Sequence, residues 1–158
     1  MRTAASDRAP AYQPEQVWLP ASEQLLEWDD RFHDLMLGDD LRMDAYRAAV
    51  AEAVRPGDTD LDLGTGTGIL ALWALRAGAR RVHGIDLNET VLATAADRIG
   101  AAGFGDRFHP LHGLSFDVEL PERVDVVVSE ILGNLADNEN APVILGHARR
   151  RFLRDGGS

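Results

Sequence analysis

Apolar and polar positions along the chain follow two alternating periods, which predicts strands that alternate with helices. Short apolar runs between turn residues predict strands, and apolar residues spaced three or four positions apart predict helices. The expected strands are 59–63, 81–86, 108–112 and 124–129. The expected helices between and after them are 68–77, 89–102 and 141–153. This order predicts right-handed βαβ units, hence an α/β fold whose parallel sheet has helices on both faces.

The segment before the first strand has a different pattern. Residues 1–20 carry Pro10, Pro14 and Pro20 without a clear period, so we expect a flexible tail there. A helix is expected from Ser22 to Leu37, ended by Gly38, and a second helix opens at Asp39 or Asp40 and ends before Pro56-Gly57. The expected organisation is a tail over 1–20, covering helices over 21–57, and a sheet domain over 58–158.

The expected fourth strand, 124–129, reads Val-Asp-Val-Val-Val-Ser and is apolar enough to lie inside a parallel sheet. A fifth strand would begin where the sequence stops, at Ser158. Without it the fourth strand would be a bare edge, which promotes aggregation. We therefore expect C-terminal strands of this sheet to be missing from the chain.

Composition narrows the classes of function. The chain has 158 residues, enough for one domain, and no cysteine, which excludes disulfides and thiolate metal sites. Its five histidines are scattered, so we expect no metal.

The chain has no long apolar run and no hydrophobic leader, so we expect a cytoplasmic protein without membrane contact. The net charge of −10 argues against nucleic-acid binding and suits a cationic substrate. All sixteen basic residues are arginine, which together with much alanine and glycine suggests a GC-rich bacterial gene.

Three alternate glycines, Gly64, Gly66 and Gly68, stand between an expected strand and an expected helix. Glycine lets the backbone turn sharply and approach a ligand, and the helix start presents free N–H groups. The dinucleotide fingerprint fails because Ile69 occupies the position of its third glycine, and a Walker loop is excluded because the chain has no lysine. Asp86 ends the second strand, where a carboxylate can accept hydrogen bonds from both ribose hydroxyls.

The run Leu61-Asp62-Leu63-Gly64-Thr65-Gly66-Thr67-Gly68 resembles the first motif of the class I methyltransferases. The resemblance implies a Rossmann-like sheet, S-adenosylmethionine as the cofactor and S-adenosylhomocysteine as the product. It places backbone near Gly64 and Gly66 along the methionine part, Asp86 at the ribose and the segment 113–115 at the adenine edge. The cofactor-binding residues that we assign are Met36, Arg42, Asp62, Gly64, Thr65, Gly66, Asp86, Leu87, Leu114, Ser115 and Glu130.

Two glutamates follow the fourth strand. Glu130 comes directly after it, and Glu139 follows nine positions later, with Gly133 allowing the chain to fold back. Because parallel sheets bind ligands at the carboxyl ends of their strands, Glu130 lies where a substrate should meet the cofactor. Two carboxylates facing one cleft would clamp a guanidinium and orient one of its nitrogens, so both are candidate catalytic residues. Alternatively, Glu139 is an exposed acid at a helix start, where it favours the helix dipole.

The run from Ser129 to Glu139 resembles the double-glutamate hairpin of the protein arginine methyltransferases. Residues 33–42 and Tyr46 resemble the segment that precedes the first strand in that family. The resemblance implies that Met36 packs on the cofactor, that Arg42 holds its carboxylate, and that the substrate carries a guanidino group on a protein or a small molecule. It also leaves a homodimer open. The sequence departs from the family in lacking a tyrosine-rich first helix and in having Asp86 where glutamate is usual.

Two other readings remain open from the sequence. One is a class I methyltransferase that acts on oxygen, carbon or another nitrogen of a metabolite, with the two glutamates making other polar contacts. The other is a module that binds the cofactor without turnover.

Overall fold

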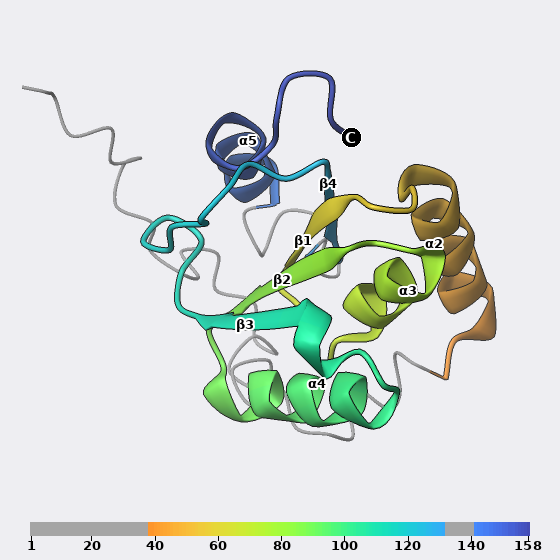
Figure 1. The fold of residues 1–158 in the computed structure, drawn as a ribbon. Coiled ribbons are helices and arrows are strands. Elements are labelled where there is room, and N and C mark those ends of the chain that lie inside the picture. Colours follow the sequence, from red (N-terminus) through yellow and green to blue (C-terminus); the bar gives the residue numbers. More distant parts are fainter. Residues whose placement is uncertain (1–37, 132–140) are drawn as a thin grey trace, which may run out of the picture.

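Four parallel strands organise the structure, a computed structural model that describes residues 38–131 and 141–158. They are β1 (Thr59–Leu63), β2 (Arg81–Asp86), β3 (Phe108–His112) and β4 (Val126–Ser129), in the order β3-β2-β1-β4. β1 lies between β2 and β4 and is buried along its whole length, because it is central in a sheet that helices cover on both faces (Figure 1). The predicted bounds of the first three strands are confirmed.

Helices cover both faces of the sheet, as predicted (Figure 1). α2 (Asp40–Ala53), α3 (Ile69–Ala77) and α4 (Glu89–Ala101) pack on one face, and the short η2 (Gly105–Arg107) leads from α4 into β3. α5 (Ala141–Arg151) packs on the other face, where Ala148 and the following Phe152 meet Leu61 and Leu63 of β1. The two faces therefore have separate apolar cores.

The helix ends follow local chemistry. The carboxylate of Asp39 accepts a hydrogen bond from the Arg42 amide at 3.1 Å and caps α2, and Asn88 caps α4 through the amides of Thr90 and Val91. Gly68 is left-handed (φ +79°), so α3 begins at Ile69 and not at Gly68 as predicted. A Cβ on Gly68 would lie 2.8 Å from the Cβ of Ala95, so this turn also brings α4 close.

Three other predicted ends are corrected by one or two residues. α4 ends at Ala101, one residue early, because Ala102 is its cap. α5 ends at Arg151 and β4 begins at Val126, because Val124 forms a parallel bridge with Leu153 instead of pairing with β1.

The outer edge of β4 is partly covered, which corrects the expectation of a bare edge. The carbonyl of Val124 accepts a hydrogen bond from the Arg154 amide, and the amide of Val124 donates one to the Phe152 carbonyl. Farther along, the amide of Val127 donates to the carbonyl of Ser158 at 2.8 Å, and the amide of Ser158 donates to Asp125 at 3.0 Å. The last residues of the chain therefore run beside β4.

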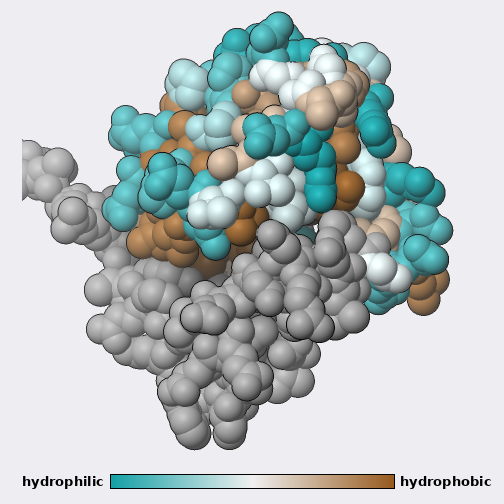
Figure 2. Space-filling view, turned by 90° about the horizontal axis from the view of Figure 1, so that it is seen from below, coloured by the Kyte–Doolittle hydropathy of each residue, from teal (hydrophilic) through white to brown (hydrophobic). Residues whose placement is uncertain are grey.

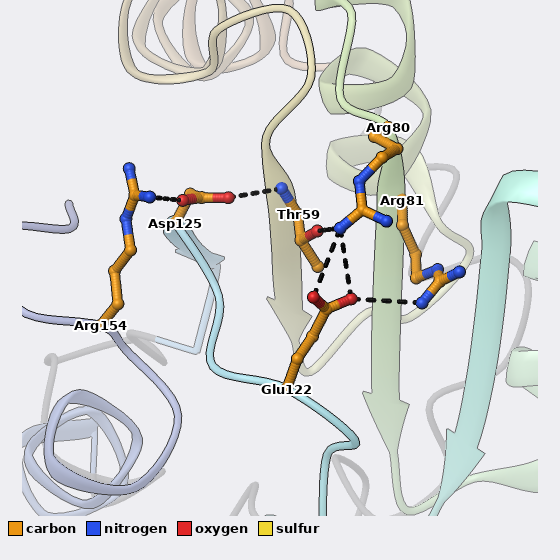
Figure 3. A network of polar contacts seen from close by, with 6 residues as sticks. All are labelled: Thr59, Arg80, Arg81, Glu122, Asp125 and Arg154. Atoms are coloured by element: carbon orange, nitrogen blue, oxygen red, sulfur yellow. Dashed lines mark hydrogen bonds and ion pairs between the residues drawn. The ribbon is translucent and has the colours of Figure 1, made fainter.

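A polar network joins the strands at their amino ends (Figure 3). The Glu122 carboxylate pairs with the guanidinium groups of Arg80 and Arg81 at 3.3 and 3.2 Å. Asp125 accepts the amide of Thr59 at 2.7 Å and pairs with Arg154 at 2.5 Å. This network lies at the end of the sheet opposite to the glycine loop, so it stabilises the fold and leaves the carboxyl ends free for ligands.

Hydrophilic side chains dominate the described surface in Figure 2, with smaller apolar patches between them. The large apolar side chains that are exposed belong to Leu41, Leu87, Val143 and Leu145. No described helix is long and apolar enough to cross a membrane. Likewise, no described group of three or more histidine or acidic side chains could hold a metal ion. The predicted helix over 22–37, with Met36, and the second glutamate, Glu139, lie outside the described residues.

Candidate functional site

The acids singled out in the sequence gather at one edge of the sheet. β1, β2 and β4 are parallel and neighbouring, so their carboxyl ends meet. Asp62 lies next to the end of β1, Asp86 ends β2, and Glu130 directly follows β4. The hydroxyl of Ser129 donates to the carbonyl of Leu63 at 2.6 Å and ties the ends of β4 and β1 together.

The glycine loop leaves β1 in a backbone conformation that other residues rarely adopt. Gly64, Gly66 and Gly68 have φ angles of +72°, +50° and +79°. The amides of Gly64 and Thr65 both donate to the carbonyl of Ile85, which holds the loop against β2. A Cβ on Gly64 would lie 2.7 Å from Cγ2 of Ile131, so the chain after β4 passes directly over this glycine. The loop therefore lies where β1, β2 and the segment that carries Glu130 come close together.

Asp62 stabilises this loop through buried hydrogen bonds. Its side chain is fully buried, and Oδ2 accepts hydrogen bonds from the Thr65 hydroxyl at 2.7 Å and from the Ala71 amide at 2.9 Å. Burial raises the pKa of Asp62 to about 7, although these two hydrogen bonds lower it. Oδ1 is buried without a hydrogen-bond partner among the described residues. The contacts of Asp62 and Thr65 order the loop, and direct contact of either side chain with a cofactor stays a prediction.

Asp86 is held so that its carboxylate faces the loop. Oδ2 accepts the amide of Gly66 at 2.8 Å, and Oδ1 accepts the amide of Asn88 at 2.9 Å. A carboxylate oxygen has more than one acceptor position, so each oxygen can still bind a further donor. Asp86 is half-buried, which leaves it open to a ligand at the carboxyl end of β2.

The residues expected at the adenine come together beside Asp86. The amide of Gly113 donates to the Asp86 carbonyl at 2.9 Å, and a ring nitrogen of His112 lies 3.0 Å from the Leu87 carbonyl oxygen. The segment after β3 thus lies against the one after β2. Leu87 is 55% exposed, whereas Ser115 is buried, with its carbonyl 3.2 Å from a ring nitrogen of His147. Leu114, which directly precedes Ser115 in the sequence, is half-buried.

Glu130 forms an ion pair with Arg42. Nη2 of Arg42 lies 2.5 Å from Oε1 of Glu130, and both side chains are partly shielded from solvent. Tyr46, one helical turn after Arg42 on α2, is also close to both groups. Burial is the largest influence on the pKa of the Tyr46 hydroxyl and raises it, as does the charge of Glu130. The charge of Arg42 and its hydrogen bond to the phenol lower that pKa.

Several residues of this site were not assigned from the sequence. Ile131 packs over Gly64, and Arg98 of α4 donates to the carbonyl and the hydroxyl of Thr67 at 3.1 and 2.8 Å. Asn88 carries a recognisable signal, because it precedes a helix that needs an N-cap. Ile131 and Arg98 carry none, since their contacts join segments that are distant in sequence.

A family model described as a methyltransferase domain matches residues 61–157, which include the glycine loop, Asp86 and Glu130. The chain belongs to the methyltransferase domain family. This match, together with the parallel sheet, confirms the Rossmann-like fold predicted from the sequence.

Similarity to curated and solved proteins narrows the relationship of this methyltransferase domain. It is 35% identical over 127 residues to probable protein arginine N-methyltransferase 6 of Arabidopsis thaliana, an alignment covering 79% of the chain and 29% of the relative. The crystal structure of Arabidopsis thaliana protein arginine methyltransferase 10 superposes with a TM-score of 0.76 at 35% identity, covering 82% of the chain and 37% of that protein. The predicted resemblance to the protein arginine methyltransferases is confirmed.

A second solved structure is the Trypanosoma brucei PRMT1 enzyme–prozyme heterotetrameric complex with AdoHcy. Its TM-score is 0.72 at 33% identity, and the match covers 78% of the methyltransferase domain and 39% of that chain. The chain spans between 15% and 40% of the length of the curated relatives that it matches.

Proposed function

We propose that this methyltransferase domain binds S-adenosylmethionine and transfers its methyl group to a guanidino nitrogen. The observation that carries the proposal is the ion pair of Glu130. The carboxylate stands beside the glycine loop and binds a guanidinium, that of Arg42, at 2.5 Å. A carboxylate that pairs with a guanidinium in this position has the charge and the geometry to receive that of a substrate.

The residues at the edge of the sheet fit the cofactor. Gly64 has no side chain where the backbone must be approached closely, and a Cβ there would already meet Ile131. Asp86 keeps acceptor capacity for ribose hydroxyls beyond its bonds to Gly66 and Asn88. S-adenosylmethionine would supply an electrophilic methyl group attached to a positively charged sulfur. The exposed Leu87 and the half-buried Leu114 would lie along its adenine.

The work of the protein is then positioning and electrostatics. Glu130, with Glu139 as its proposed partner, would hold the guanidinium so that one nitrogen points toward the methyl group. As that nitrogen gives up part of its delocalisation, the positive charge shifts to the remaining nitrogens, where a carboxylate stabilises it. Methylation of a guanidinium releases one proton, and the free oxygen of the same carboxylate is a nearby acceptor.

The relatives favour a protein substrate over a small molecule, because they are named protein arginine N-methyltransferases. The net charge of −10 suits a basic protein segment and disfavours nucleic acid. We therefore propose an arginine in a cationic segment as the acceptor.

The test is methyl transfer by the purified protein from S-adenosylmethionine labelled in the methyl group. The acceptors are a glycine- and arginine-rich peptide, the same peptide with every arginine replaced by lysine, and free arginine. We expect label in the arginine peptide, located on a guanidino nitrogen by fragmentation mass spectrometry. Label in the lysine peptide or on an oxygen would contradict the proposal, as would S-adenosylhomocysteine binding without transfer to any guanidino compound.

A further inference from the structure

Arg98 reaches from α4 to the glycine loop. Its Nη1 donates hydrogen bonds to the hydroxyl of Thr67 at 2.8 Å and to the carbonyl of Thr67 at 3.1 Å. Thr67 is buried, and the next residue, Gly68, lies so close to α4 that a Cβ on it would be 2.8 Å from the Cβ of Ala95. Ala95 and Arg98 are three positions apart and lie on the same side of the helix. This side of α4 therefore packs directly on the end of the loop.

The hydrogen bonds of Arg98 continue through the loop. The peptide group that follows Thr67 accepts from Arg98 through its carbonyl, and its N–H donates to the carbonyl of Thr65 at 2.8 Å. The peptide group that follows Thr65 in turn donates its N–H to Oδ2 of Asp86, also at 2.8 Å. Two peptide groups thus connect the guanidinium of Arg98 to the carboxylate of Asp86.

All donors in this chain of hydrogen bonds point the same way, from the cation toward the anion. Each peptide group accepts on the side of Arg98 and donates on the side of Asp86, so its dipole is favourable to both charges. Hydrogen bonds in such a chain polarise and strengthen one another, and those that involve a charged group are the stronger kind. Within the described part of the chain, no other residue donates to the Thr67 carbonyl. Loss of the guanidinium would therefore release the first peptide group.

We propose that Arg98 is a positioning residue for the cofactor, which holds Asp86 in place through these two peptide groups. The loop amide fills one acceptor position of Oδ2, so a fixed loop also fixes the direction in which the carboxylate meets the ribose hydroxyls. The inference rests on the proposed function for the identity of the ligand. α4 then holds the site at two points, at its start through the bond between Asp86 and Asn88 and near its end through Arg98.

The direct test is Arg98→Met, which keeps an apolar stem and removes the guanidinium. We expect the Kd for S-adenosylhomocysteine, measured by isothermal titration calorimetry, to rise about tenfold, at the lower end of the effect of a hydrogen bond to a charged group. Arg76→Met is the matched control, because it removes the same charge from an exposed position on the neighbouring helix α3. It should bind as the wild type does. Unchanged affinity in Arg98→Met would overturn the inference.

A double-mutant cycle tests the route of the effect. If Arg98 acts through Asp86, then Arg98→Met in an Asp86→Ala background should change the Kd by less than about twofold. A full tenfold loss in that background would overturn the inference, because Arg98 would then act on the ligand independently of Asp86.

A second measurement needs no ligand. NMR of the ¹⁵N-labelled protein follows the exchange of backbone amide protons with water, and Gly66 reports on the loop, whereas Gly84 in the middle of β2 reports on the whole sheet. We expect Arg98→Met to make exchange at Gly66 about tenfold faster and to leave Gly84 unchanged.

An equal acceleration at both glycines would show general destabilisation and would refute the positioning role, as would unchanged exchange at Gly66. Faster exchange at Gly66 alone, in a protein that methylates no guanidino compound, would support the role of Arg98 and refute only the proposed function.

Discussion

The carboxylate of Asp86 accepts a hydrogen bond from the backbone N–H of Gly66, with 2.8 Å between Oδ2 and the amide nitrogen. The residue expected to hold the ribose therefore also holds the glycine loop. Because its other oxygen accepts the amide of Asn88, the same carboxylate orders the start of α4. Loop shape and the proposed recognition of the nucleoside therefore depend on one side chain.

The first prediction concerns this double role. Asp86→Ala should weaken S-adenosylhomocysteine binding by about 1–3 kcal/mol, because ribose hydroxyls and the Gly66 amide would both lose their acceptor. Isothermal titration calorimetry measures the change. Asp97→Ala removes the same charge from an exposed position on α4 and should bind as the wild type does. Saturable binding of NAD with none of S-adenosylhomocysteine would show that the site belongs to another nucleotide.

The sheet was predictable because each strand is a short apolar run between turn residues. The limits of β4 and α5 were not, since the bridge between Val124 and Leu153 joins residues far apart in sequence. For the same reason the pair of Arg42 and Glu130 escaped prediction, although both residues were assigned to the site. The sequence pattern identifies which residues carry the chemistry, whereas long-range packing decides which of them touch.

The second prediction concerns Asp60, which is fully buried on β1 with neither oxygen hydrogen-bonded among the described residues. Burial, followed by the charges of Asp58 and Asp125, raises the pKa of Asp60 to about 7. A pKa raised on folding means that stability is present below the unfolded value of 3.8 and is lost as the pH rises through about 7.

Asp60→Asn keeps the shape and removes this titration. Relative to the wild type, the variant should therefore gain on the order of 2–4 kcal/mol in free energy of unfolding between pH 4 and pH 8. Urea denaturation at both pH values measures it. Asp62 titrates in the same direction but is present in both proteins, so its contribution cancels in the comparison. A difference in stability that is independent of pH would refute the prediction.

The third prediction concerns His83, where stability is lost as the pH falls and not as it rises. His83 is buried beside His109, with ring centroids 5.5 Å apart, and neither of its ring nitrogens has a hydrogen-bond partner in the described structure. Burial, followed by the charges of His109 and Arg81, lowers the pKa of His83 to about 4. The charge of Glu122 raises this pKa, whereas the charge of Arg80 lowers it. Stability from a neutral His83 is thus present above its ordinary pKa of 6.5 and is lost as the pH falls toward 4.

His83→Leu, which has no proton to bind, should resist acid better than the wild type. The advantage should grow by about 2–3 kcal/mol between pH 7 and pH 4 in urea titrations. His112→Gln, at an exposed position, is the control and should follow the wild type. If the wild type and His83→Leu lost stability in parallel as the pH falls, the buried histidine would not be the source of acid sensitivity.

The last prediction concerns the two glutamates. Gln at either position keeps the size of the side chain and one acceptor but removes the charge that holds a guanidinium. Glu130→Gln and Glu139→Gln should each lower methyl transfer to the arginine peptide by a factor of about 10²–10³, the range for one preorganised electrostatic group. Affinity for S-adenosylhomocysteine should change far less, because Asp86 and the glycine loop remain. Glu119→Gln is the matched control, since it breaks only an exposed pair with Arg151 and should turn over normally. Near-normal turnover in both glutamate variants would mean that the pair is not a guanidinium clamp. The domain would then be better described as a methyltransferase for another class of acceptor.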